Sequence, residues 1–295
     1  MLDLDYLHRL REQYADALHA PVAGFQLRGK SFPNSGVPNL MGVVNLSPDS
    51  WYRESVCLST AQAIRRGQRL AAEGADIIDI GAESTILNAK TVDESAQTNA
   101  LLPVIQELSE AGILVSAETY HPAVAEACLK AGAAVLNLTG IEASKDIYRQ
   151  VADYDAGVII CYMQGKNVRN VGDFQLAEDH TRALLDYFSR QIELAVKSGV
   201  KRIWIDPGLG FYYKNLQDSA TRVRYQMQTF LNTFRLRKLG WPTCHALPHA
   251  FEYFEDEVRS AEAFFAVLAV LGKTNLLRTH EIGKVAGVVR TLDVL

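Results

Sequence analysis

Three short apolar runs in the chain end abruptly in polar, turn-forming residues. Residues 41–45 lead into Leu46-Ser47-Pro48-Asp49-Ser50, residues 77–80 into Gly81-Ala82-Glu83-Ser84-Thr85, and residues 202–205 into Asp206-Pro207-Gly208-Leu209-Gly210. Short apolar runs bounded by turn signals are typical of buried strands. Strands that each carry polar groups at their carboxyl ends predict a parallel barrel whose active site is assembled there.

The alternation of strand and helix patterns is regular from residue 39 onward. Strands are predicted at residues 40–45, 77–81, 113–117, 134–138, 157–162, 202–206, 242–247 and 275–279. Helical patterns follow at residues 60–73, 93–111, 121–132, 144–153, 176–198, 215–239, 255–271 and 281–293. Eight such units predict a single (β/α)8 TIM barrel. An open doubly wound sheet is the rival, disfavoured because no GxGxxG follows the first strand.

Residues 1–38 are predicted to form an extension, and residues 39–295 the barrel domain. Leucines at helical spacing within residues 3–18 predict an N-terminal helix, and the glycines and prolines of residues 20–38 predict a loop with one short hairpin. The polar stretch 163–175 is expected to form a long loop over the top of the barrel.

Composition narrows the class of protein. A formal net charge of −4 gives no basic footprint for nucleic acid. The four scattered cysteines predict reduced thiols in a cytoplasmic protein. The charged N-terminus lacks an apolar signal core, and no apolar run approaches the roughly 20 residues that span a bilayer.

Polar residues at the first two strand ends are candidate ligands. The Asn45 amide could bind Mg²⁺ or a phosphate oxygen, although a turn cap is the plainer interpretation. Thr85 could donate to a phosphate. For Glu83 a structural role is as plausible as a catalytic one.

Carboxylates and an amide end three further strands. Glu118 must find a partner, since burying an unpaired charge is expensive, and a ligand with adjacent N–H donors would serve. Asn137 and Asp206 could together face the edge of a planar heterocycle. A buried structural network has about even odds for either residue alone.

The last two strands end in basic residues. Arg278 and His280 lie on the same side of their strand and suit an anion such as diphosphate, whereas pairing of Arg278 with a carboxylate explains less. Cys244, His245 and His249 make a zinc site conceivable, but no second cluster with ligand spacing accompanies them. Core or supporting histidines are the preferred interpretation.

Five motifs, in order, resemble those of the pterin-binding family, most closely its dihydropteroate synthases. They are MGVVNLSPDSW, GADIIDIGAEST, SAETYHPAVAEACLKAGAAVLNLTG, IDPGLGF and LLRTHEI, within about residues 39–285. The resemblance implies a TIM-barrel transferase of folate biosynthesis. It would condense 6-hydroxymethyl-7,8-dihydropterin diphosphate with p-aminobenzoate or a related amine, releasing diphosphate with Mg²⁺ bound to it.

The resemblance also implies roles for individual residues. Asn45 would lie near the metal and phosphate, Thr85 in the second loop, and Asn137 and Asp206 against the pterin. Arg278 and His280 would bind the diphosphate, so these two and Asp206 are the expected catalytic residues. Met163 is expected to contact substrate, and a homodimer through the last two helices is expected by analogy.

Three positions depart from the family pattern. Glu118 replaces the pterin-binding aspartate, His249 stands opposite a pterin-contacting lysine, and Ser84-Thr85-Ile86-Leu87-Asn88 replaces Ser-Thr-Arg-Pro-Gly. A divergent synthase is the leading hypothesis. The alternative is a pterin-binding homologue without synthase activity, and a corrinoid-linked methyltransferase domain ranks last.

Overall fold

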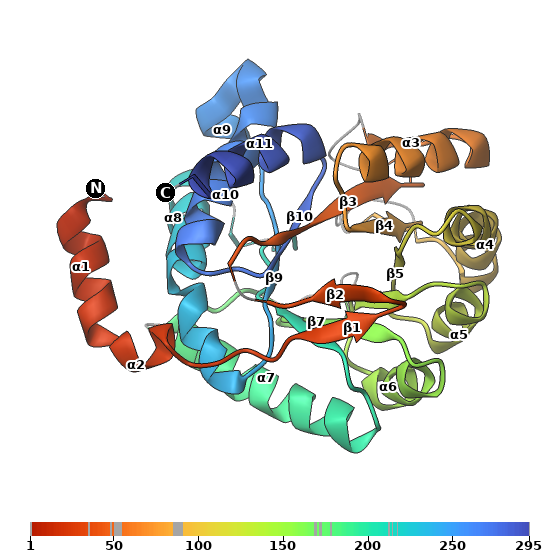
Figure 1. Ribbon diagram of the computed structural model, residues 1–295, viewed down its shortest axis with the longest axis horizontal. Coiled ribbons are helices and arrows are strands. Elements are labelled where there is room, and N and C mark those ends of the chain that lie inside the picture. The colour runs from red at the N-terminus through yellow and green to blue at the C-terminus, as the bar shows by residue number, and fades with distance from the viewer. Residues whose placement is uncertain are drawn as a thin grey trace.

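The computed structural model describes residues 2–294 except 35, 48, 50–54, 85–90, 168–169, 171–172, 178, 212, 214 and 217. Eight parallel strands form its centre (Figure 1). They are β3 (Asn39–Asn45), β4 (Ile77–Gly81), β5 (Val115–Thr119), β6 (Val135–Leu138), β7 (Gly157–Cys161), β8 (Ile203–Asp206), β9 (Cys244–Ala246) and β10 (Leu276–Thr279).

The strands follow the order β8-β7-β6-β5-β4-β3-β10-β9. From β3 to β8 each strand pairs with the next one in sequence, β9 pairs with β10, and β10 pairs with β3. The last gap is bridged between Ile205 and Thr243, where the Ile205 N–H donates to the Pro242 carbonyl at 3.0 Å. The sheet therefore closes between β8 and β9, and the predicted TIM barrel is confirmed.

Helices surround this barrel (Figure 1). They are α3 (Thr60–Ala72), α4 (Glu94–Glu110), α5 (Pro122–Lys130), α6 (Ser144–Asp153), α7 (His180–Lys197), α8 (Ser219–Asn232), α9 (Phe251–Phe254), α10 (Ala261–Leu271) and α11 (Ile282–Leu292), with 3-10 turns η2 (Thr233–Leu239) and η3 (Glu255–Ser260). Among the described residues, no helix has both the length and the apolar character needed to cross a bilayer.

Two predicted helices begin later than expected because aspartates cap them. Asp179 accepts from the Arg182 N–H and Asp218 from the Thr221 N–H, so α7 and α8 begin just after these residues. The predicted strand 113–117 also begins late. The Ile113 N–H still bonds to Leu108 of α4, which places Ile113 in the turn that ends the helix.

The N-terminal extension forms α1 (Leu4–Gln13), α2 (Ala15–Leu18) and the expected hairpin, β1 (Phe25–Leu27) with β2 (Lys30–Phe32). Phe32 is fully buried, with its ring 5.3 Å from that of Trp204. The hairpin side chains pack on Met41, Ile77 and Leu276, near the amino ends of the strands. The hairpin thus covers the amino end of the barrel.

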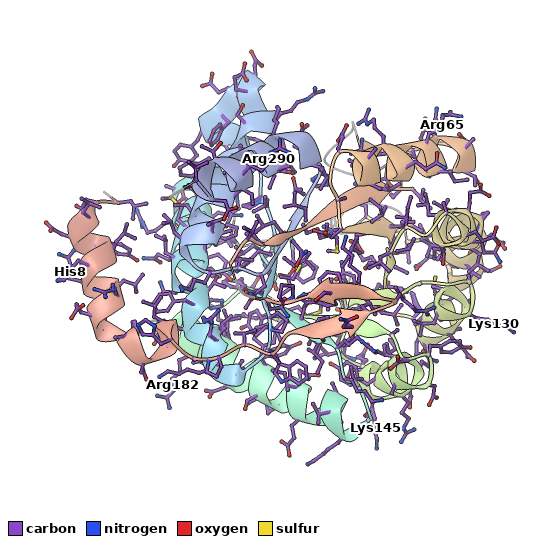
Figure 2. All side chains as sticks on the ribbon, in the orientation of Figure 1. His8, Arg65, Lys130, Lys145, Arg182 and Arg290 are labelled. Atoms are coloured by element: carbon purple, nitrogen blue, oxygen red, sulfur yellow. The ribbon has the colours of Figure 1, made fainter. Side chains whose placement is uncertain are left out.

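Alternation along the strands separates an inner from an outer set of side chains. Ile78, Ile80 and Leu136 belong to the cluster that packs against the helices, whereas Met41 and Ile159 belong to the inner cluster. Charged side chains such as Arg65, Lys130 and Arg182 point outward from the helices (Figure 2). The inward positions nearest the carboxyl ends are polar, and these build the site.

Candidate functional site

A cavity of about 440 Å³ opens at the carboxyl ends of the strands. Seven of the predicted site residues line it: Asn45, Glu118, Asn137, Asp206, His249, Arg278 and His280. The volume falls in the range of about 300–1,000 Å³ typical of small-molecule sites. These seven residues come from six strand ends, which the barrel brings together.

The polar side chains at the strand ends form the floor of the cavity, and among them Arg278 bonds to two carboxylates. Its Nε donates to Asp79 at 2.7 Å and its Nη2 donates to Glu118 at 2.8 Å. The Arg278 side chain is 16% exposed, Glu118 is 10% exposed and Asp79 is fully buried. The pairing with carboxylates that the sequence disfavoured is therefore present, although Arg278 still lines the cavity.

Asp79 is a buried site residue that sequence reasoning missed. It accepts from the Ser116 hydroxyl at 2.6 Å and from the Asn137 amide at 3.1 Å, besides Arg278. A carboxylate within the apolar run Ile77-Ile78-Asp79-Ile80 was the available signal, since such a charge must be paired. Asn137 also accepts from the Cys161 thiol at 3.3 Å, so it belongs to a buried network.

Asp206 is held in place by backbone donors. The Gly208 N–H donates to its carboxylate at 2.7 Å. Gly208 has a φ of 79°, and a Cβ there would lie 2.1 Å from the Tyr162 carbonyl oxygen, so only glycine fits the turn. Burial raises the pKa of Asp206 to about 6, although these backbone bonds and Arg278 oppose the rise.

Glu118 has a still more strongly displaced pKa. Burial raises its pKa to about 7, Arg278 opposes the rise, and the Asp79 carboxylate adds to it. One guanidinium faces two carboxylates here, and the nearby Asp206 carboxylate raises the pKa of Glu118 further. Protonation of Glu118 relieves this excess of negative charge.

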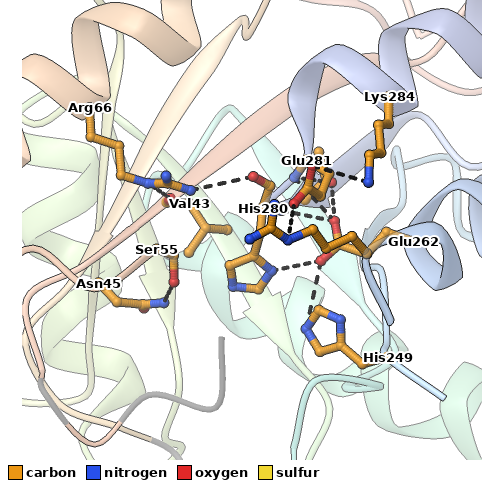
Figure 3. Close-up of polar contacts among 11 residues, drawn as sticks. Val43, Asn45, Ser55, Arg66, His249, Glu262, His280, Glu281 and Lys284 are labelled. Atoms are coloured by element: carbon orange, nitrogen blue, oxygen red, sulfur yellow. Dashed lines mark hydrogen bonds and ion pairs between the residues drawn. The ribbon is translucent and has the colours of Figure 1, made fainter. Parts of the chain in front are cut away.

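His249 and His280 face a common carboxylate, Glu262 (Figure 3). Glu262 Oε1 lies 2.7 Å from His280 Nδ1 and 3.7 Å from His249 Nε2. Despite its burial, Glu262 has a lowered pKa because both histidines and Thr279 stabilise the carboxylate. His245 faces away from the site, since it is fully buried and bonds to Thr233 at 2.7 Å, whereas the fully buried Cys244 lies beside Asp206.

Asn45 ends β3 as predicted, and its amide nitrogen donates to the Ser55 hydroxyl at 2.5 Å (Figure 3). Arg66 links β3 to the residue that follows β10, because it donates to the carbonyls of Val43 at 3.1 Å and His280 at 3.3 Å. Glu83 accepts from the Val92 N–H and the Tyr120 hydroxyl while lining the cavity.

Two predicted contacts remain to be placed. Thr85 lies outside the described residues. Met163 is 3% exposed and is not among the described residues that line the cavity. An unpredicted rim is present instead, where Arg222 bonds to Glu252 at 2.7 Å beside Phe251. These residues come from α8 and α9. Because α9 has only four residues, its sequence shows no helical hydrophobic pattern that would have predicted it.

Known proteins resemble this chain over nearly its full length. The dihydropteroate synthase of Streptococcus pyogenes serotype M6 is 28% identical over 272 residues, covering 89% of this chain and 93% of that protein. The Bacillus subtilis enzyme is 26% identical over 269 residues, covering 87% and 88%. A Xanthomonas albilineans dihydropteroate synthase structure with 4-aminobenzoic acid has a TM-score of 0.76 at 26% identity, covering 92% and 97%.

A family model described as "Pterin binding enzyme" matches residues 41–247, well over half of the chain. The matched span begins in β3 and reaches the residue after β9, so it includes most of the strand ends that build the cavity. The chain belongs to the pterin-binding enzyme family.

Proposed function

We propose that this protein is a dihydropteroate synthase-type transferase. It joins 6-hydroxymethyl-7,8-dihydropterin diphosphate to p-aminobenzoate or a related amine and releases diphosphate, a step of folate biosynthesis in the cytoplasm. The observation that carries the proposal is the cavity that unites Glu118, Asp206, Arg278 and His280 in a member of the pterin-binding family.

Carboxylates at the cavity floor would bind the pterin. Asp206 is held by the Gly208 N–H, so its orientation is set before a ligand arrives. Its carboxylate can accept from the ring N–H and amino groups of a pterin. Glu118 can do the same once its ion pair with Arg278 rearranges. Asn137 supports this floor through Asp79.

Arg278 and His280 would stabilise the leaving diphosphate. The two ion pairs of Arg278 use its Nε and Nη2, whereas a guanidinium carries five N–H donors in all. Donors from Nη1 can therefore reach a phosphate without breaking either pair. As the bond between carbon and oxygen breaks, negative charge grows on diphosphate, and these groups stabilise that charge.

Asn45 is the proposed Mg²⁺ ligand. Its amide nitrogen donates to Ser55, so the ligating atom would be Oδ1, the hard oxygen that Mg²⁺ prefers. A single protein ligand fits an ion held mainly by substrate phosphates and water. When bound, Mg²⁺ neutralises charge on the departing diphosphate. Thr85 and Met163 remain proposed substrate contacts.

The amine needs little activation, because an arylamine is already a nucleophile. Around the cavity the described residues include no Ser-His-Asp arrangement, and the reaction does not require one. The chain's own contribution is to hold the two substrates in line and to exclude water. The rim formed by Phe251 and Arg222 is a suitable place for an aromatic amine.

Diphosphate release tests the proposal directly. Purified protein is incubated with the pterin diphosphate, p-aminobenzoate and Mg²⁺. Turnover is expected, and Asp206→Asn should lower kcat/KM about 10- to 100-fold, the loss of one charged hydrogen bond. Asp186→Asn on the exposed face of α7 is the matched control. Pterin binding without turnover would favour the binding homologue, and absence of both would refute the proposal.

A further inference from the structure

Two histidines and a buried glutamate converge beside the cavity (Figure 3). His249 follows β9, Glu262 lies in the first turn of α10, and His280 follows β10. Their potential ligand atoms, one from each residue, all lie within 4.8 Å of one another. We propose that these three residues form a binding site for a divalent transition-metal ion, with Zn²⁺ as the preferred occupant.

The carboxylate of Glu262 is already fixed in a ligating orientation. Its Oε2 accepts from the backbone N–H groups of His280 at 2.9 Å and Glu281 at 3.3 Å, and from the Thr279 hydroxyl. These three donors leave Oε1 directed at the two imidazoles. Hydrogen bonds that orient a ligating side chain in this way are a regular feature of protein metal sites.

The distances also suit a metal ion. Zinc bonds of about 2.0–2.2 Å place neighbouring ligand atoms roughly 3.3 Å apart in a tetrahedral site. The separations of 2.7 Å and 3.7 Å from Glu262 Oε1 to the two histidine nitrogens lie on either side of that value. Small side-chain movements would therefore accommodate an ion.

The ligand set leaves room for a further ligand. Two histidines and one glutamate are a known set for catalytic zinc, with a fourth position open to water or substrate. His249 and His280 both line the cavity, whereas Glu262 is fully buried behind them. The open position thus faces the cavity and would take a water molecule or an anionic oxygen of a ligand.

Charges near the site are arranged so that a cation is favoured. Arg278 pairs with Asp79 and Glu118, and Lys284 pairs with Glu281 at 3.8 Å. Among the residues that the structure describes, Glu262 forms ion pairs with the two histidines and with no lysine or arginine, so a buried carboxylate there gains from a metal cation. Nitrogen ligands also distinguish this site from the all-oxygen Mg²⁺ position proposed at Asn45.

Metal binding is measured without substrate, so the result does not depend on the proposed function. The tag-free chain is stripped with a chelator and titrated with Zn²⁺ by calorimetry, then with Co²⁺ to record visible absorption bands. One ion per chain is expected. His249→Ala, His280→Ala and Glu262→Gln should each weaken binding by more than about 100-fold, beyond the effect of losing an outer hydrogen bond.

His8→Ala is the matched control, because His8 is exposed on α1, away from the barrel (Figure 2). It should bind Zn²⁺ like the unchanged chain. Circular dichroism of every variant establishes that the fold is retained. Tight binding that persists in a His249→Ala/His280→Ala double variant would place the ion elsewhere, and failure of the unchanged chain to bind one ion would also overturn the proposal.

Discussion

At the scale of single residues, the buried carboxylates of the site outnumber the cations that pair with them. Arg278 pairs with Asp79 and Glu118, and burial raises the pKa of Glu118 to about 7. The Glu118 carboxylate lies 2.8 Å from the guanidinium. Two consequences can be measured.

Pterin affinity is expected to depend on pH through Glu118. The ionised carboxylate accepts pterin N–H groups through both oxygens and more strongly than the neutral acid does, and a raised pKa means that ionisation is completed as pH rises through about 7. Affinity for the pterin should therefore increase between about pH 6 and pH 8, as measured by fluorescence titration.

Glu118→Gln is the variant that isolates this effect, because it cannot ionise. In this variant the increase in pterin affinity near pH 7 should disappear. The increase near pH 6 should remain, because it comes from Asp206, whose pKa is raised to about 6 by burial. An unchanged step near pH 7 in Glu118→Gln would show that another group is responsible.

Removing the Arg278 cation should destabilise the fold. Arg278→Met leaves Asp79 and Glu118 buried without their partner, a change that costs about 3–5 kcal/mol. Urea unfolding measures the loss. Arg290→Met on the exposed surface of α11 is the control and should change stability by less than about 0.5 kcal/mol. Equal stabilities of the two variants would contradict the buried ion-pair account.

At the scale of secondary-structure elements, the two ends of the barrel differ in function: one holds the cavity and the other is packed for stability. The carboxyl end presents the cavity, whereas the β1–β2 hairpin packs its apolar side chains against the amino end. The hairpin lies in the extension and not in the repeating units, so its contribution to stability comes from a segment outside the barrel proper (Figure 1).

Truncating the hairpin core is expected to weaken the barrel. Phe32 is fully buried against Trp204, so Phe32→Ala should lower the free energy of unfolding by about 3–5 kcal/mol. Ser31→Ala, one residue earlier and exposed, should have little effect. Thermal and urea unfolding compare the two, and a small loss for Phe32→Ala would mean that the hairpin is not part of the core.

At the scale of the whole molecule, the outer surface of α10 carries exposed apolar side chains. Phe264 is 39% exposed and Leu271 is 49% exposed, and residues seven apart lie on one face of a helix. Exposed apolar side chains grouped on one face are typical of an interface. We therefore retain the proposal that two copies associate through this region.

The association is tested by light scattering after size-exclusion chromatography. A dimer is expected, and Phe264→Glu/Leu271→Glu should convert it to a monomer because charges are placed in an apolar contact. Val196→Glu, at a comparably exposed position on α7, should leave the dimer intact. A monomeric unchanged chain, or a dimer that survives the double substitution, would contradict the proposal.

The sequence by itself determined the barrel and most of its cavity. Successive side chains point to opposite faces of a strand, so alternate residues point into the closed barrel, and Asn137, Asp206 and Arg278 all line its cavity. The hairpin and the order of the units were also predictable, because turn residues and helix caps act locally.

Only the tertiary structure decided which charges are paired. Asp79 lies 199 residues before Arg278, and Glu262 meets His249 and His280 across separate elements. No local pattern encodes such contacts, because they depend on how the ring closes and on side-chain reach within it. The sequence showed which chemical groups reach the site, and the closed barrel determined which of them bind one another and which remain for a ligand.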